Sequence, residues 1–248
     1  MATLYVYALT CDSNFAPCFD NDVFSLACCK GGKNGGMRNS VKHTKDREDK
    51  RGENVYILGV CSKSLSKEAK KNLNDNVDRD YKPLFFARVD ECVEYSDYYA
   101  DNSVYKGRTD QRAYSVVKGE IVPNEECNPH FGNHEAIEKD IGGRYVLISK
   151  EFIYLGDQCG KLSTSIEEKH KYIFCTDTSN NEQKAGIDKH FRGYIIFEDF
   201  DCEVINQSMS EAREYIGDSI PGHLSKEYII DEADDEKDIV VCKCGGKK

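Results

Sequence analysis

Apolar residues occur in short runs separated by long polar stretches, and this pattern predicts strands more often than helices. The first run, LYVYAL at residues 4–9, alternates aliphatic and aromatic side chains, so we expect a strand with a core face beside an aromatic face. The run LFFARV is continuous enough to be buried on both faces. These and the remaining apolar runs predict strands at residues 4–9, 55–60, 84–89, 145–148, 152–155, 172–175, 194–200 and 239–241. The turn SKE is expected to join the two strands between 145 and 155 into a hairpin.

Helical signals are fewer. The segment SLSKEAKKNLN at residues 64–74 favours a helix, with Ser66 as a possible cap. Ser208 and Glu211 form a capping box for a helix that ends at Gly217. Residues 161–172 are expected as helix or loop, capped by Ser163 or Thr164, and residues 31–53 as one long loop because they hold almost no apolar side chain.

Short strands with few helices and no regular strand–helix alternation predict an α+β fold, with a mainly antiparallel, curved or barrel-like sheet and a few peripheral helices. A chain of 248 residues, 39% hydrophobic and 31% charged, suits one large domain or two small ones. We expect residues 1–200 to form the main domain. Residues 201–248 would then complete it with a helix, an acidic segment and a short strand.

Composition and charge limit the cellular compartment and the kinds of partner that we expect. Twelve scattered cysteines without an export signal predict reduced thiols in a cytoplasm, and no apolar run approaches the roughly 18 residues that cross a membrane. A net charge of −10 argues against a protein that coats nucleic acid nonspecifically. Residues 30–51, however, carry eight Lys or Arg against three acids, so this segment is either a solvated loop or a contact for a small anion or a short nucleic acid. The acidic residues 227–238 offer a surface for a protein partner.

Candidate chemistry begins directly after the first strand. Cys18, Cys28, Cys29 and Lys30 lie in one loop, and Lys30 precedes two glycines. An ammonium group beside a glycine turn is suited to meet a phosphate or carboxylate, because the turn exposes backbone N–H groups next to it. The glycines are not followed by the Lys-Ser/Thr of a Walker loop. The alternative is a buried pair of small thiols beside a solvated lysine.

Possible metal ligands are weaker signals. His130 and His134 are four residues apart, but Pro129 and Gly132 interrupt a helix that would align them, so a packing role in a loop is favoured. The C-x-C sequence near the C-terminus could supply half of a zinc site and has no matching pair nearby. No metal site is predicted, and nothing in the residues indicates a cofactor.

Several motifs occur in the order of a known family. They are FAPC at 15–18, ACCKGG at 27–32, MR at 37–38, VYILGVCSK at 55–63, LFFARVDE at 84–91 and YVLISKEFIYLGD at 145–157. Together they resemble the nucleotide modification associated domain 2 family, with Gly31 where that family often has proline. The resemblance implies a role in phage or bacterial systems that modify bases in nucleic acid. The strand order is also similar to small PUA-like barrels, which hold modified bases.

Three functions are compatible with these features, and the sequence favours the first, with the second as its alternative. The first is recognition of a nucleotide or modified base, with phosphate met by basic side chains and the base stacked on tyrosines. The second is a base- or nucleotide-modifying enzyme with Cys18 or Cys29 as nucleophile and lysines as electrostatic stabilisers. The third is a regulatory partner in a defence or modification operon. The expected catalytic residues are Cys18, Cys29 and Lys30, and the expected ligand-binding residues are Tyr7, Arg38, Tyr56, Ser62, Lys63 and Arg88. We expect the turns carrying Lys30 and Lys63 to converge on one concavity.

Overall fold

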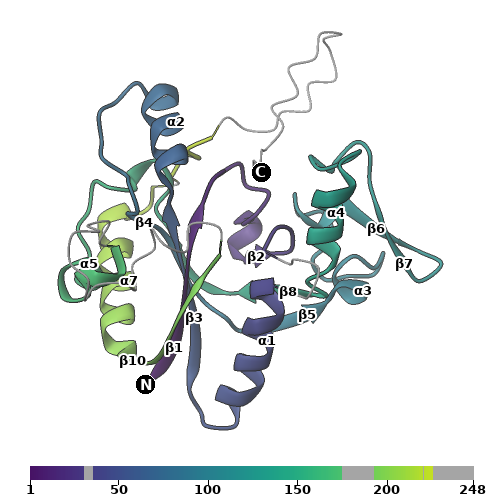
Figure 1. The fold of residues 1–248 in the computed structure, drawn as a ribbon, viewed down its shortest axis with the longest axis horizontal. Helices are drawn as coiled ribbons and strands as arrows, with labels where there is room; N and C mark the ends of the chain where they lie inside the picture. The colour runs from purple at the N-terminus through teal and green to yellow at the C-terminus, as the bar shows by residue number, and fades with distance from the viewer. Residues whose placement is uncertain (31–35, 175–192, 220, 226–248) are drawn as a thin grey trace. The chain divides into compact units, whose positions relative to one another are not determined.

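The structure is a computed structural model that describes residues 1–30, 36–174, 193–219 and 221–225 (Figure 1). The chain forms two compact units, each built from segments that are separated in the sequence. Unit 1 comprises the described residues of Met1–Asp12, His43–Asp90 and Ser149–Ser225. Unit 2 comprises those of Ser13–Lys42 and Glu91–Ile148. No helix in the described part of the chain combines the length and the apolar character needed to cross a membrane.

Unit 1 contains a five-stranded sheet in which β1 and β3 are parallel neighbours and the other pairs are antiparallel (Figure 1). Every residue of β1 is buried, so the face that carries Tyr5 and Tyr7 is covered as well as the opposite face. Tyr5 shows why, because its hydroxyl shares a 2.8 Å hydrogen bond with Thr44 Oγ1. The strand order is β10 (Ile195–Phe200), β1 (Ala2–Leu9), β3 (Asn54–Cys61), β4 (Pro83–Arg88) and β9 (Glu151–Tyr154).

Gly59 in β3 permits the close approach expected of a glycine within a strand. A Cβ atom at this position would lie 2.0 Å from the ring of Phe85 on the neighbouring strand β4. The Phe85 ring therefore occupies the space that any other residue at position 59 would need.

The helices of unit 1 start at residues that differ from some expected caps. Ser62, not Ser66, caps α2 (Lys63–Leu73) by accepting a hydrogen bond from Leu65 N at 3.2 Å. Helix α7 (Cys202–Ile216) begins at the cap Asp201, so the capping box predicted at Ser208 is wrong. Of the two caps expected at Ser163 or Thr164, Thr164 is the one that caps α5 (Ser165–Lys169), in a capping box with Glu167. Residues 171–174 form helix α6 (Lys171–Phe174) where a strand was expected.

Ser208 lies inside α7 because its hydroxyl serves a neighbouring helix. Its Oγ accepts a 2.9 Å hydrogen bond from the backbone N–H of Ile166 at the start of α5. Glu211, one turn later, accepts from the backbone N–H of Ser165 at 2.7 Å. The two residues therefore join α7 to α5. The serine and glutamate that resemble a capping box in the sequence instead form contacts between two helices.

Helix α1 (Gly36–Asp49) replaces most of the loop expected at residues 31–53. Its buried side follows the helical spacing of Met37, Val41, Thr44 and Glu48, of which only the first two are apolar. Since polar residues complete the buried stripe, the hydrophobic period that reveals a helix is absent from the sequence.

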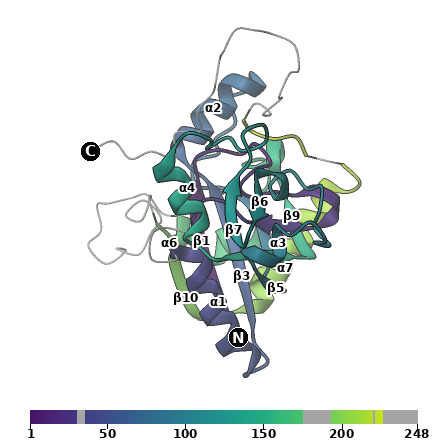
Figure 2. The same ribbon diagram turned by 90° about the vertical axis from the view of Figure 1, so that its right-hand side faces the viewer.

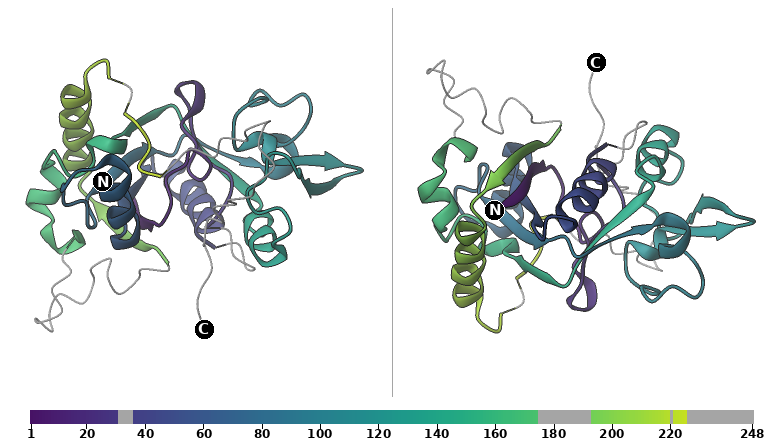
Figure 3. Two further views of the ribbon diagram at one scale, coloured as in Figure 1. Left: turned by 90° about the horizontal axis from the view of Figure 1, so that it is seen from above. Right: turned by 90° about the horizontal axis from the view of Figure 1, so that it is seen from below.

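Unit 2 has a small sheet, a hairpin and short helices around a tyrosine-rich core. Helix α4 lies beside the hairpin β6–β7 (Figure 2), which extends from the rest of the unit (Figure 3). The sheet has the order β2 (Phe24–Leu26), β8 (Tyr145–Ser149), β5 (Glu91–Glu94), and the other elements are β6 (Tyr114–Val117), β7 (Glu120–Pro123), α3 (Tyr95–Tyr98) and α4 (His134–Ile141). The core includes Ala27, Cys28, Tyr95, Tyr98, Tyr99, Tyr114, Val146 and Ile148.

The mixed composition of helices and strands and the mainly antiparallel pairing are confirmed, but the described strands close no barrel. The hairpin predicted from SKE is wrong, because β8 pairs with β5 while β9 pairs with β4 in the other sheet. A one-residue break at Lys150 explains the change, since its backbone N–H donates to Asp90 Oδ2 at 2.7 Å instead of continuing a ladder. The expected strand at 239–241 and the C-x-C sequence lie outside the described residues.

Candidate active site

Cys29 lies in the loop that leaves β2 in unit 2, and its backbone is held in an uncommon conformation. Both Cys29 and Lys30 have positive φ values, 57° and 53°. Non-glycine residues adopt this left-handed region at an energetic cost that the surrounding structure must offset. Here a 2.6 Å hydrogen bond from the Cys29 N–H to Asp140 Oδ1 contributes to that compensation. The Cys29 side chain stays partly exposed.

His130 approaches the same carboxylate from the loop before α4. Its Nδ1 lies 2.7 Å from Asp140 Oδ2, and the ring packs edge-on against Phe15 with a centroid distance of 5.6 Å. Tyr114 donates a third hydrogen bond to Asp140, from its hydroxyl to Oδ2 at 2.8 Å. His130 is only 4% exposed and Asp140 only 1%, so this carboxylate is held entirely by protein donors.

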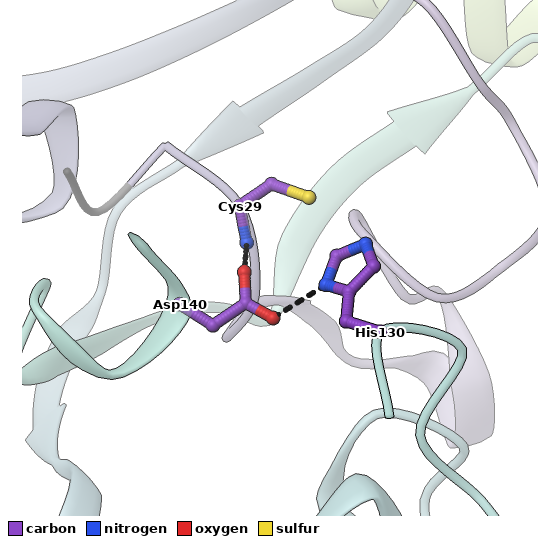
Figure 4. A group of neighbouring side chains, drawn as sticks. All are labelled: Cys29, His130 and Asp140. Atoms are coloured by element: carbon purple, nitrogen blue, oxygen red, sulfur yellow. Dashed lines mark hydrogen bonds and ion pairs between the residues drawn. The ribbon is translucent and has the colours of Figure 1, made fainter. Parts of the chain in front are cut away.

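Cys29, His130 and Asp140, here called the Cys29 triad, bring a thiol, an imidazole and a carboxylate together (Figure 4). One sulfur, nitrogen and oxygen atom from the three side chains lie within 4.8 Å of one another. A nucleophile beside a base that is oriented by a third group is the arrangement used in covalent catalysis. Because both oxygens of Asp140 accept hydrogen bonds, Asp140 is suited to orient His130, and His130 is suited to exchange protons with Cys29.

The three side chains are also of the types that bind zinc, because thiolate sulfur, imidazole nitrogen and carboxylate oxygen are zinc ligands. Within the described ranges, this is the one group of such side chains that comes so close together. The Asp140 carboxylate, however, already accepts hydrogen bonds from the Cys29 N–H and the Tyr114 hydroxyl, and it lies against His130 Nδ1. A metal bound through Oδ2 would have to displace Tyr114 or His130, and only one lone pair of Oδ1 is left. The hydrogen-bonding pattern therefore fits an acid–base triad better than a metal centre.

Arg38, expected to bind a phosphate, has a different place in the structure. Its side chain is fully buried, and it donates to the backbone carbonyls of Ala27 and Asp140 and to that of Tyr145 at 3.2 Å. The hydroxyl of Tyr95 lies against the same guanidinium. Arg38 thus ties the segment that leads to Cys29 to the end of α4 that carries Asp140. It offers no surface to a ligand in this conformation.

The other cysteines of this loop are less suited to act as nucleophiles. Cys18 and Cys28 are fully buried. Burial, aided by the charge of Asp110, raises the pKa of the Cys18 thiol. Burial, aided by Asp140, likewise raises the pKa of the Cys28 thiol. Because the thiolate is the reactive form, Cys29 is the better candidate of the three, and the partly exposed Lys30 follows it directly.

The remaining expected ligand-binding residues all lie in unit 1. Tyr7 is buried edge-on against Phe85, at a centroid distance of 6.0 Å, and Ser62 is buried as the cap of α2. Neither side chain presents a face to a bound base. The other three are Tyr56, Lys63 and Arg88.

Tyr56 is buried, and its hydroxyl donates to an asparagine oxygen of α7 at 3.0 Å. Arg88 pairs with Asp90 at 3.0 Å and with Glu151 at 2.6 Å. Lys63 is exposed, and its ammonium lies 5.4 Å from the ring centroid of Tyr81. Lys30 belongs to unit 2, so the shared concavity for Lys30 and Lys63 stays a prediction.

The sequence alone did not single out Asp140. It lies in EAIEKDI, which resembles an ordinary solvated helix. One signal was present: Asp140 is three residues after Ile137, a spacing that places the two side chains near each other on a helix. A charged residue within an apolar stripe is a sign of a buried partner. His134 is exposed at the start of α4, so the two histidines do not form a pair.

Comparison with known protein families matches residues 1–195 to the family described as nucleotide modification associated domain 2. The chain belongs to this family. The nucleotide modification associated domain 2 match includes all three residues of the Cys29 triad, and it ends before α7. The family name connects the chain with nucleotide modification. No curated protein and no solved structure matches the chain.

Proposed function

We propose that this protein is a nucleotide-modifying enzyme that uses the thiol of Cys29 as its nucleophile. The observation that supports this most directly is the Cys29 triad, in which one carboxylate holds both the Cys29 N–H and His130 Nδ1, at 2.6 and 2.7 Å. The family match supplies the substrate class at its coarsest level. The role fits a phage or bacterial base-modification system in a reducing cytoplasm, where the thiol would stay reduced.

Each member of the triad has a distinct task in this proposal. His130 accepts the thiol proton of Cys29, which leaves a thiolate, and later returns a proton to the departing or developing group. Asp140 fixes the orientation of the imidazole and stabilises its protonated form. Lys30 follows Cys29 with a partly exposed side chain, and its ammonium is assigned to the phosphate of a nucleotide.

Recognition of a nucleotide or modified base without chemistry is the second candidate. It is favoured by Lys63, whose exposed ammonium group lies in the first turn of α2, where backbone N–H groups also attract anions. A pure recognition protein would bind nucleotides equally well when Cys29 is replaced. An enzyme with covalent catalysis would lose its chemistry and retain much of its binding.

Alkylation of the full-length protein tests the proposal. Iodoacetamide at pH 7 followed by peptide mapping should label Cys29 about tenfold faster than Cys127, which is also partly exposed, because Cys29 belongs to a close group with His130 and Asp140. His130→Ala should remove that advantage, while Cys127→Ser should leave the Cys29 rate unchanged. Equal, slow labelling of Cys29 and Cys127 in the unmodified protein would refute the nucleophile. Bound metal that protects Cys29 until a chelator is added would also refute it.

A further inference from the structure

The acid–base groups of the Cys29 triad restrict which bond of a nucleotide can react, and this deepens the proposed function on which it rests. Glycosidic bond hydrolysis commonly uses two carboxylates, one as an acid and one as a base or nucleophile. The triad has one carboxylate, and both of its oxygens are occupied by hydrogen bonds. Phosphoryl transfer relies on metal ions or cationic clamps around the phosphate. Arg38, the cation that contacts Asp140, is buried on backbone carbonyls instead.

The nucleophile itself points to carbon. A thiolate is a soft nucleophile that adds readily to a carbon–carbon double bond conjugated with a carbonyl or imine group. Among the nucleobases, pyrimidines have such a bond between C5 and C6, and the aromatic purines do not. We infer that Cys29 adds to C6 of a pyrimidine base, so that the substrate is a cytosine or uracil nucleotide, free or in a single strand.

The step can be written with its atoms and electrons balanced. The Cys29 Sγ–C6 bond forms as the π bond between C5 and C6 breaks, and its electron pair moves through C5 toward O4 in uracil or the ring nitrogen N3 in cytosine. C5 becomes a nucleophile and takes a proton from protonated His130 or from water. Loss of the original C5 proton and expulsion of Cys29 regenerate the base. No oxidant, reductant or second substrate is required for this exchange.

The geometry also limits the form of the substrate. Cys29 is only partly exposed, and the ring of His130 is almost wholly buried behind it. A base stacked within a duplex presents its C6 edge beside the sugar and cannot reach such a thiol without leaving the stack. A free nucleotide or a single strand avoids the cost of unpairing, which is why it is the form proposed here.

Exchange of the C5 hydrogen in deuterated water provides the test. The full-length protein is incubated with dCMP, with dUMP and with a single-stranded oligonucleotide that contains both bases, and deuterium at C5 is followed by NMR and mass spectrometry. We expect an acceleration over buffer of at least about 100-fold, the scale of positioned acid–base catalysis. Cys29→Ser should exchange at the buffer rate, and Cys127→Ser should match the unmodified protein.

The outcomes separate this inference from the proposed function. Absence of C5 exchange in all three substrates overturns the pyrimidine assignment, even if Cys29 remains the fast-alkylating thiol. Conversion of cytosine to uracil is measured separately in ordinary water. If it depends on Cys29 while no C5 exchange occurs in deuterated water, the inference is overturned too, since attack would then occur at C4. Exchange that persists in Cys29→Ser would refute both proposals. Exchange that depends on Cys29 and falls in Asp140→Asn would support both.

Discussion

Replacement of Arg38 by methionine is the sharpest test of how the candidate site is held together. Methionine removes the guanidinium but keeps a long unbranched side chain in the buried space. The cation is bonded to three backbone carbonyls, those of Ala27, Asp140 and Tyr145, and it touches the Tyr95 hydroxyl. We therefore expect the segments that carry Cys29 and Asp140 to loosen together.

The magnitude follows from the contacts. A hydrogen bond to a charged group contributes about 1.5–3 kcal/mol, so three bonds to carbonyls amount to a gross loss of about 4.5–9 kcal/mol. Two effects reduce this loss. The Tyr95 hydroxyl also reaches the carbonyls of Ala27 and Asp140 and can keep them paired, and the variant no longer has to bury a cation. We expect a net destabilisation of about 3 kcal/mol, or a fall in Tm of roughly 6–12 °C for a chain of this size.

Two measurements check this expectation. The chain has no tryptophan, so unfolding is followed by far-UV circular dichroism. Hydrogen exchange with mass spectrometry then reports on residues 24–30 and 134–141, both of which should exchange faster in Arg38→Met. Arg213→Met in α7 is the matched control, because that residue is exposed on another helix and its replacement should leave both measurements unchanged. A loss below about 1 kcal/mol with unchanged exchange would refute the tie between the two segments.

Three further outcomes are expected. Gly59→Ala should destabilise unit 1 by about 1–3 kcal/mol in urea unfolding, because its Cβ would overlap the Phe85 ring, and a neutral result would contradict the close packing. The hydrogen bond from Arg79 holds the pKa of Asp75 at about 2, below its ordinary 3.8, so the folded state binds fewer protons there. The stabilisation of the fold by the ionised Asp75 should be complete above pH 4 and lost as the pH falls through 2. Asp75→Asn should therefore flatten that part of the acid-unfolding profile. Burial raises the pKa of Cys18, so iodoacetamide at pH 8 should label it only after unfolding, and native labelling would show that this thiol is accessible.

The strands were predictable from the sequence where apolar residues dominate on both faces. The runs at 4–9, 55–60, 84–89 and 194–200 correspond to β1, β3, β4 and β10. Pairing was less accessible, because neighbours in sequence usually pair and β8 and β9 do not. Helix α1 was missed for a related reason: Thr44 and Glu48 occupy buried positions where the hydrophobic pattern would require apolar residues.

Only part of the candidate site, the loop that carries Cys29, could be predicted from the sequence. The dense Cys, Lys and Gly composition pointed to the loop of Cys29, and the family motifs supported it. Arg38 was assigned to phosphate because it lies in the basic segment of residues 30–51, whereas here carbonyls of distant segments accept from its two terminal nitrogens. Asp140 and His130 could not be connected to Cys29, because their contact depends on chain segments about a hundred residues apart.

That separation has a consequence for the order of events during synthesis. Cys29 and Asp140 are 111 positions apart, and ribosomes add roughly 5–20 residues per second, so the thiol emerges about 5–20 s before its carboxylate partner exists. During that interval, neither the imidazole nor α4 is present to shield the nascent cysteine. Oxidation of this thiol, or its pairing with another cysteine, would thus act on the growing chain before the protein is complete.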